Sequence, residues 1–270
     1  MAHHFYEHHI DIRKNKICPF KVAFLKDYRP LTCNWHENIE IMLITEGEGV
    51  IFYGSEEKRF QKGDIVIINS GVIHRTYCEK GFESYFIIID ESFAKENGLS
   101  AADRIFTPIF RSDKTKRLFE AVVKEEKAKR KDTPVGAAKL RLAMLELLID
   151  ICEEHSEIRD KKEKNEKASE QYVKRVMIHI GDHYAEELTL EGLAELCGVT
   201  KHHLAREFKA YTGMTVMTYL NLIRCKNAEG CLLSGASATE AAVECGFESI
   251  SYFSRTYKKI MGASPSGVKK

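Results

Sequence analysis

The sequence feature that most constrains the fold is a repeat within the last hundred residues. Each copy consists of a short predicted helix, a glycine and a longer predicted helix, and Leu204 and Phe208 of the first copy recur as Phe253 and Tyr257 in the second. In order, the segments are LEGLAELC, Gly198 and KHHLAREFKAY, and then EAAVEC, Gly246 and ISYFSRTYKK. Two copies are too few for a solenoid, in which about three or more repeats must stack to bury a continuous core. The repeat therefore predicts a pair of similar modules.

Hydroxyl side chains precede the four predicted helices and are expected to cap them. A Ser or Thr at this position accepts a hydrogen bond from a backbone N–H of the first helical turn. The expected caps are Thr189 and Thr200 in the first copy, and Thr239 and Ser249 in the second. The glycine after each short helix permits the left-handed conformation with which helices often end. Each copy thus has the local signals of a helix-turn-helix.

The second helix of each copy has an apolar face and a basic face. The i,i+4 pairs Leu204 with Phe208, and Phe253 with Tyr257, are expected to anchor these helices inward. The residues expected on the outer faces are Lys201, His202, Ala205, Arg206 and Lys209 in the first copy, and Ile250, Ser251, Arg255, Lys258 and Lys259 in the second. Arginine suits bidentate contacts to guanine, and lysine suits phosphate. The alternative is an ordinary bundle with solvated faces, and two copies in the same phase favour DNA binding over it.

The net charge limits how strongly such a protein binds DNA. The chain has 41 Lys plus Arg and 40 Asp plus Glu, a formal charge of +1, so no whole-protein field steers it onto a polyanion. The basic residues are concentrated, however, and Ile250 to Lys259 contains three of them and no acidic residue. We therefore expect DNA binding with a modest salt dependence. The predicted helix between the copies would hold the two reading helices about one DNA turn apart, roughly 34 Å.

Residues 171–268 resemble the DNA-binding domain of the AraC/XylS family of bacterial transcription regulators. The matching text is LTLEGLAELCGVTKHHLAREFKAYTG, YLNLIRCKNAEGCLL and ATEAAVECGFESISYFSRTYKKIMGASPSGVKK, which includes the family's GF turn and G-x-S-P ending. The resemblance implies double-stranded DNA as the partner and, by analogy, an activator that contacts RNA polymerase. It implies base contacts from His202, Ala205, Arg206, Ile250, Ser251 and Arg255.

The resemblance also assigns a role to Arg224 and reveals a departure. Arg224 matches a common arginine of the family, for which we expect a structural or phosphate-directed role. Ala205, Ile250 and Ser251 stand where several members have longer polar side chains. Sequence readout is therefore expected to depend on Arg206, on Arg255, on methyl contacts or on DNA shape.

Before the repeat, residues 39–90 are typical of β-strands. The runs IEIMLITEGEG, VIFYG, KRFQKGDIVIIN and ESYFIIID are separated by glycine-bearing turns, as in an antiparallel barrel or sandwich. Since 270 residues exceed the usual size of one core, we predict an α+β fold of two domains, a cupin-like antiparallel β-barrel with following helices and an all-α double helix-turn-helix domain. The predicted bounds are 1–110 for the barrel, 111–152 for the helical segment, 153–168 for a charged linker and 169–270 for the DNA-binding domain.

The helical segment carries an apolar stripe at near-heptad spacing. Its members fall on one helical face and are Leu140, Met144, Leu147, Leu148 and Ile151. The stripe suits packing on the barrel and a partner helix equally well. We predict a homodimer through residues 115–152. The following linker has too few apolar residues to bury itself and is expected to be an exposed helix or a coil.

Two histidines and a carboxylate form the candidate effector site. His36, Glu40 and His74 resemble the two signature motifs of the cupin barrel, with Asn34 and Asn69 replacing a usual histidine and proline. Two imidazoles and a carboxylate suit a divalent metal. Because one ligand position of four is changed, we favour hydrogen bonds to a ligand or to each other and predict no metal cofactor. The expected lining of a pocket for a sugar or small acid is Tyr28, His36, Glu40, His74 and Arg75.

Two classes of function follow from these patterns. The favoured one is a sequence-specific DNA-binding regulator modulated by a small molecule, which is not an enzyme. The alternative is a metal-dependent cupin enzyme with a helical appendage, which predicts stoichiometric metal on His36, Glu40 and His74. The paired modules and Asn34 favour the regulator. No stretch of about 18 uncharged apolar residues and no apolar leader occurs, so we expect no membrane association and a cytoplasmic location.

Overall fold

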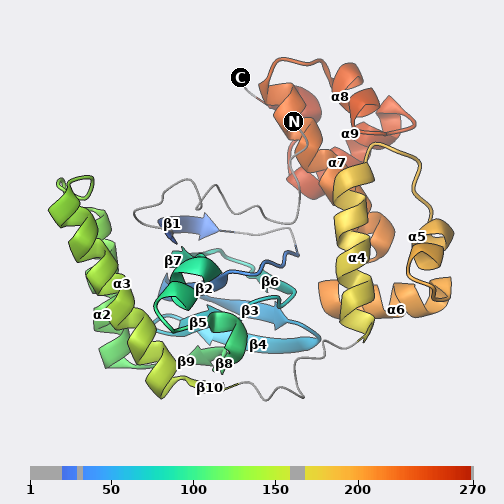
Figure 1. The fold of residues 1–270 in the computed structure, drawn as a ribbon. Helices are drawn as coiled ribbons and strands as arrows, with labels where there is room; N and C mark the ends of the chain where they lie inside the picture. The colour runs from blue at the N-terminus through green and yellow to red at the C-terminus, as the bar shows by residue number, and fades with distance from the viewer. Residues whose placement is uncertain (1–19, 29–32, 159–167, 269–270) are drawn as a thin grey trace. The chain divides into compact units, whose positions relative to one another are not determined.

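The computed structural model describes residues 20–28, 33–158 and 168–268. The chain forms two compact units, a β-rich unit built on residues 35–158 with the strand at 20–28, and a helical unit built on residues 168–268 (Figure 1). The predicted fold class is confirmed, because antiparallel sheets with following helices come first and an all-α domain comes second. Among the described helices, none has the length and apolar character needed to cross a membrane.

Antiparallel strands make up most of the β-rich unit. Its elements in chain order are β1 (Phe20–Tyr28), β2 (Ile39–Glu46), β3 (Glu48–Tyr53), β4 (Glu56–Gln61), β5 (Ile65–Ile68), β6 (His74–Tyr77), β7 (Phe82–Ile89), α1 (Glu91–Glu96), the short 3₁₀ helix η2 (Ala101–Asp103), β8 (Arg104–Phe106), β9 (Ile109–Phe110), α2 (Asp113–Glu126), α3 (Pro134–Glu154) and β10 (Ser156–Ile158). A five-stranded sheet has the order β1-β7-β2-β5-β9, and a three-stranded sheet has the order β4-β3-β6. β8 and β10 form a separate pair.

Both faces of the five-stranded sheet are buried, which explains its continuous apolar strands. In β2, Ile41 and Leu43 belong to one core and Met42 and Ile44 to another, because successive side chains of a strand point to opposite faces. The second core is completed by the three-stranded sheet, for example by Ile51. A strand that is buried on both faces is hydrophobic at nearly every position rather than at alternate ones.

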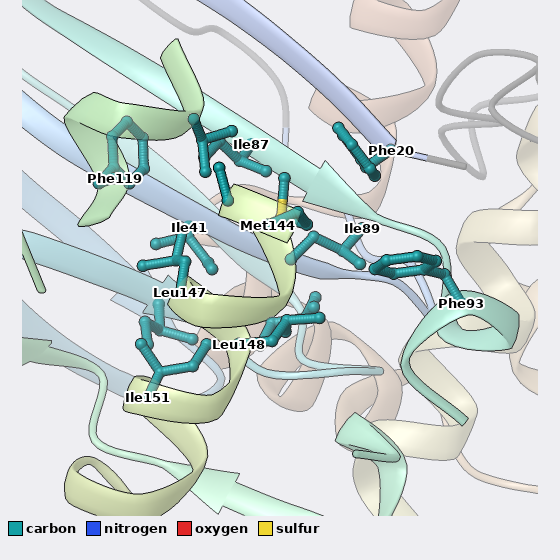
Figure 2. Close-up of a cluster of buried hydrophobic side chains, with 14 of the residues drawn as sticks. Phe20, Ile41, Ile87, Ile89, Phe93, Phe119, Met144, Leu147, Leu148 and Ile151 are labelled. Carbon is teal, nitrogen blue, oxygen red and sulfur yellow. The ribbon is translucent and has the colours of Figure 1, made fainter. Parts of the chain in front are cut away.

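The helices α2 and α3 cover the first core. The predicted stripe of α3, from Leu140 to Ile151, packs with Phe119 of α2 against Ile87 and Ile89 of the sheet (Figure 2). Each fully buried aliphatic side chain of this kind stabilises the fold by about 1.5–3 kcal/mol. Of the two alternatives for this stripe, packing on the sheet is the observed one. The stripe is therefore buried within the unit and is not available to a partner helix.

The first residues of the predicted linker belong to the β-rich unit. The helix α3 continues to Glu154, and β10 then pairs with β8 in the register Ser156 to Phe106. The backbone N–H of Thr107 donates to the carbonyl of His155 at 2.8 Å. Backbone pairing requires no apolar side chain, so a charged segment can supply this strand. The rest of the predicted linker, residues 159–167, lies outside the described part of the chain.

The helical unit consists of two helix-turn-helix modules joined by a long helix. Its elements are α4 (Ala168–His183), α5 (Leu190–Leu196), α6 (Lys201–Thr212), α7 (Val216–Leu233), α8 (Ala238–Glu244), α9 (Ile250–Met261) and the short 3₁₀ helix η4 (Pro265–Gly267). Three predicted caps are confirmed: Thr189, Thr200 and Ser249 each accept a hydrogen bond from the first turn of α5, α6 and α9, respectively.

The predicted cap of α8 was wrong. The helix begins two residues earlier than expected, so Thr239 lies inside it and Ser237 is the cap. The Ser237 hydroxyl accepts from the Glu240 N–H at 3.2 Å, and a Glu240 carboxylate oxygen accepts from the Ser237 N–H at 2.8 Å. This reciprocal capping box satisfies two backbone donors, whereas a cap at Thr239 would have no glutamate three residues later.

The sequence analysis did not predict α4. Its buried residues Val173, Val176, Met177 and Ile180 have the i, i+3, i+4, i+7 spacing of an amphipathic helix, so the signal was present. α4 contacts α6 and α7 and completes the core under the first module.

Candidate functional site

The outer face of α6 is exposed and basic. Leu204 and Phe208 are buried as predicted, and Phe208 meets Tyr219 of α7 in an edge contact with ring centroids 5.5 Å apart. The residues that the sequence placed outward are exposed at Lys201, His202, Arg206 and Lys209 and half-buried at Ala205. The aromatic anchor thus fixes which face of α6 meets solvent.

The outer face of α9 has the same arrangement. Phe253 and Tyr257 are buried with ring centroids 5.4 Å apart. Ile250, Ser251, Arg255, Lys258 and Lys259 are all exposed. Tyr252, which the sequence analysis left out, is also exposed, and its hydroxyl accepts from the Asn221 side-chain amide of α7 at 2.8 Å. The buried apolar residues and the exposed basic residues therefore occupy equivalent positions in α6 and α9.

Two basic side chains of α6, Lys201 and Arg206, contact neighbouring polar side chains. Lys201 Nζ lies 2.6 Å from a carboxylate oxygen of Glu191, and this hydrogen bond lowers the pKa of Glu191. Arg206 pairs with Glu207 at 3.0 Å and donates to Nδ1 of His203 at 3.1 Å. Exposed pairs of this kind are worth about 0–1 kcal/mol, so a phosphate or a base edge can replace them. His203, one helical turn before Arg206, was not singled out from the sequence, and it is the acceptor of this hydrogen bond.

Arg224, for which a structural or a phosphate-directed role was expected, makes structural contacts. Its Nε donates to the carbonyl of Tyr184 at 2.7 Å, and one terminal nitrogen donates to the carbonyl of Glu186 at 2.8 Å, so it connects α7 to the segment after α4. Burial lowers the pKa of this guanidinium. The same segment contacts the turn of the second module, where a Cβ on Gly246 would lie 2.4 Å from the carbonyl oxygen of Ala185.

In the β-rich unit, the structure brings His36, Glu40 and His74 together. Nε2 of His36 lies 3.1 Å from a carboxylate oxygen of Glu40, and Nε2 of His74 lies 3.9 Å from the same oxygen. The two rings meet edge to face with centroids 5.0 Å apart. The side chains are 1%, 12% and 8% exposed for His36, Glu40 and His74, respectively. Burial, assisted by the nearby His36, lowers the pKa of His74 to about 4.

Of the other two predicted effector residues, Arg75 is not brought to this cluster. Arg75 is adjacent to His74 in β6 and therefore points to the opposite face, where its guanidinium lies 4.4 Å from the ring centroid of Phe52. The backbone of Tyr28 ends β1, and its side chain lies outside the described part of the structure. Among the predicted effector residues whose side chains the structure describes, three therefore lie together: His36, Glu40 and His74.

Asn69, which replaces the usual proline of the second cupin motif, has a structural role. Its side-chain amide donates to the carbonyl of Phe106 at 2.9 Å, and its side-chain oxygen accepts from the Phe106 N–H at 2.8 Å. The side chain is buried and also donates to the hydroxyl of Tyr53. Asn69 therefore connects the end of β5 to β8 and to β3.

A cavity lies at the ends of β2 and β6 that are far from the two histidines. Both strands begin near the histidines and end at a cavity of about 960 Å³. It is lined by the turns at Gly47 and Gly81 and by polar residues that include Arg59, Gln61 and Tyr77. Its size is within the range of small-molecule sites.

Comparison with known proteins identifies a ligand-binding domain and a DNA-binding domain in the chain. Residues 28–143 match the model of the AraC-like ligand-binding domain, and residues 193–270 match that of a helix-turn-helix domain. The chain is 27% identical over 232 residues to YbfI of Bacillus subtilis, an uncharacterized HTH-type transcriptional regulator, covering 81% of this chain and 80% of YbfI. It is 34% identical over 96 residues to the HTH-type transcriptional activator RhaS of Salmonella arizonae, covering 35% of this chain and 34% of RhaS.

Among solved structures, the chain is similar to apo ToxT of Vibrio cholerae, with 14% identity, a TM-score of 0.47 and coverage of 92% of this chain and 95% of that chain.

The two domain matches and the regulator relative define a DNA-binding transcription regulator with a ligand-binding domain. The chain belongs to the AraC family.

Proposed function

We propose that the outer faces of α6 and α9 are the DNA-binding surface. The observation that carries this proposal is that the two modules have the same arrangement of buried and exposed residues. A buried Leu–Phe pair in α6 and a buried aromatic pair in α9 each leave the basic residues on the exposed face of the helix. The proposed base contacts come from His202, Ala205, Arg206, Ile250, Ser251 and Arg255, and the proposed phosphate contacts come from Lys201, Lys209 and Lys258.

Arginine substitution tests this surface. Each bidentate contact between arginine and guanine contributes about 1–3 kcal/mol, so Arg206→Ala with Arg255→Ala should weaken binding to the chain's own upstream DNA by roughly 30-fold or more. Arg175→Ala is the control, because Arg175 is exposed on α4 and its substitution removes one positive charge from the same unit, half of the charge that the double variant removes. Fluorescence anisotropy over a salt series gives the affinities. The proposal would be contradicted if the loss of DNA-binding free energy per removed charge were the same in the double variant and in the control.

We propose further that the β-rich unit binds a small polar effector, such as a sugar or a small acid, at His36, Glu40 and His74. The buried position of these three polar side chains supports this, since polar groups in an apolar interior orient a ligand. The cavity at the far ends of β2 and β6 is the second candidate location. Mass spectrometry of molecules released from the folded chain tests the ligand class.

The proposed response is activation of transcription in the cytoplasm through contact with RNA polymerase. The support is the similarity of the helical unit to RhaS, a protein named as an activator. In vitro transcription from the upstream promoter should rise when the protein is added. A fall in transcript would instead indicate a repressor.

The proposed assembly is a homodimer through residues 115–152. With the predicted stripe buried on the sheet, the support comes from a second face of α3, on which Val135, Leu142 and Ile149 are 68%, 59% and 44% exposed. These three residues are seven apart, and Ala138 and Leu145 lie between them at the d positions of the same heptads. We call this set the outer α3 stripe. The exposed a positions and Ala138 suit a helix of a second copy, while Leu145 is half-buried and also packs against the first core.

A further inference from the structure

The turn between α2 and α3 gathers positive charge in a unit that is otherwise acidic. Residues 127–131 contain four basic residues and no acidic one. In the same unit, residues 35–110 contain 13 acidic and seven basic residues, and residues 142–158 contain five acidic and no basic residues. Figure 1 shows this turn at the end of the helix pair that lies opposite β10. The proposed DNA contacts of α6 and α9 do not account for this local excess of positive charge.

Two of the basic side chains are free to meet a partner. Lys129 and Arg130 are exposed, and among the described residues neither side chain has an ion pair or a hydrogen bond. Their neighbours are held in the unit. Lys127 Nζ lies 4.5 Å from the centroid of a tyrosine ring in β7, and Lys131 Nζ lies 2.7 Å from a carboxylate oxygen of Glu126. An anion can therefore bind Lys129 and Arg130 without displacing an existing contact.

The basic residues at the start of α2 have a different environment. Nitrogen atoms of Arg111, Lys114 and Lys116 lie 2.6, 2.7 and 3.9 Å from carboxylate oxygens, respectively. A polyanion that approached this end of the helix pair would meet those carboxylates as well as the basic groups. At the turn, Asp132 is exposed, but the four basic residues before it leave a net positive charge. The turn is therefore the better place for a polyanion.

The backbone of the turn is held in one conformation. The carbonyl oxygen of Arg130 accepts from the Thr133 N–H at 3.0 Å and from the Thr133 hydroxyl at 2.7 Å. The first turn of α3 packs closely on the same carbonyl, because a Cβ on Gly136 would lie 1.8 Å from its oxygen. A surface that is already ordered loses less conformational entropy when it binds. Lys129 and Arg130 are thus presented from a preformed turn.

We propose that Lys129 and Arg130 bind backbone phosphates of the DNA that the helical unit holds. Lysine and arginine side chains bind phosphate without reading the base sequence. DNA is the favoured polyanion because the chain belongs to a family of DNA-binding regulators. A second contact made by the same chain benefits from an effective concentration that can reach about 1 mM, so a patch of two side chains is enough to contribute. This surface lies on the β-rich unit and is additional to the proposed contacts of α6 and α9.

The salt dependence of DNA binding tests the turn. The full chain and the double variant Lys129→Gln with Arg130→Gln are titrated against the upstream duplex by fluorescence anisotropy, at about 50 and 200 mM salt. Each phosphate contact contributes about 0.9 to the slope of log affinity against log salt. With two contacts, the ratio of wild-type to variant affinity should fall by about 10-fold between these salt concentrations. The same fall is expected with a duplex of unrelated sequence, because phosphate contacts carry no sequence information.

Lys116→Gln with Arg117→Gln is the matched control. It removes the same two residue types, which are also adjacent and exposed in the β-rich unit but lie at the start of α2. The ratio of wild-type to control affinity should be the same at both salt concentrations. The charge-conserving variant Lys129→Arg with Arg130→Lys should keep the wild-type salt slope, and circular dichroism checks that every variant is folded. A Lys129→Gln, Arg130→Gln variant with the salt slope of the control would overturn the proposal.

Two further results separate this proposal from its alternatives. Co-sedimentation with phosphatidylserine vesicles tests an anionic membrane as the partner. Vesicle binding that the turn variant abolishes, together with an unchanged salt slope for DNA, would show that the turn binds lipid and that the proposal is wrong. A chain that binds DNA with the same salt slope in wild type and turn variant would refute the turn and leave the DNA-binding surface of α6 and α9 standing. A chain that binds no DNA at all would refute both.

Discussion

Truncation of Leu142 provides a quantitative test of the proposed homodimer. Leu142 is 59% exposed at the centre of the outer α3 stripe. Full burial of a leucine side chain is worth about 1.5–3 kcal/mol, so burial of the exposed portion in an interface contributes about 1–2 kcal/mol per copy. A symmetric dimer contains the residue twice. Leu142→Ala should therefore weaken dimerisation by about 2–4 kcal/mol, which is roughly 30- to 1000-fold in Kd.

The measurement is sedimentation equilibrium of the full chain over a concentration series. Folding should be nearly unaffected, because substitutions of exposed side chains usually change stability by less than about 0.5 kcal/mol. Ile158→Ala is the control, since Ile158 is 79% exposed in the β-rich unit but lies outside α3. A wild type that stays monomeric throughout, or a Leu142→Ala variant with the Kd of Ile158→Ala, would refute the reasoning.

Three further predictions concern the stability of individual contacts. Gly246→Ala should destabilise the helical unit far more than Gly198→Ala in urea unfolding, because both glycines have positive φ but only at position 246 would the new Cβ meet backbone, 2.4 Å from a carbonyl oxygen; equal losses would contradict this. Ser237→Ala removes the capping box of α8 and should cost about 1 kcal/mol, whereas Thr239→Ala should cost much less. Burial raises the pKa of Asp150, but hydrogen bonds and charge from its α2 neighbours outweigh burial and lower that pKa below 3.8. The carboxylate should therefore stabilise the fold above pH 3.8 and lose this contribution as the pH falls through the pKa that Asp150 has in the folded chain. Asp150→Asn should flatten this pH dependence of the free energy of unfolding.

The repeat made most of the helical unit predictable. Caps, glycine turns and i,i+4 apolar pairs are local signals, and they placed α5, α6 and α9 and the inward direction of Phe208 and Phe253 correctly. The error at α8 came from the choice between two hydroxyl residues. The glutamate three residues after Ser237 was the local signal that distinguishes them.

The β-rich unit was less predictable because its decisive contacts are distant in sequence. The helix α3 has apolar residues on two faces, and its sequence alone does not indicate which face packs against the sheet. In the structure, Leu140 and Met144 pack in the core with the sheet, whereas Leu142 and Ile149 are exposed. The pairing of β8 with β10 joins three-residue strands that have no pattern long enough to detect. Successive side chains of a strand point to opposite faces, so the sequence could have shown that Arg75 and His74 do not line the same site. In the structure the two side chains do lie on opposite faces of β6.

The central claim is that two modules of one chain read DNA together. Hydroxyl-radical footprinting and guanine-methylation interference on the upstream DNA test it most directly. The predicted result is two protected patches on one face of the duplex, with centres about 10–10.5 base pairs apart, of which Arg206→Ala removes contacts in one and Arg255→Ala removes contacts in the other. A single patch, or two patches that respond equally to each substitution, would contradict the account.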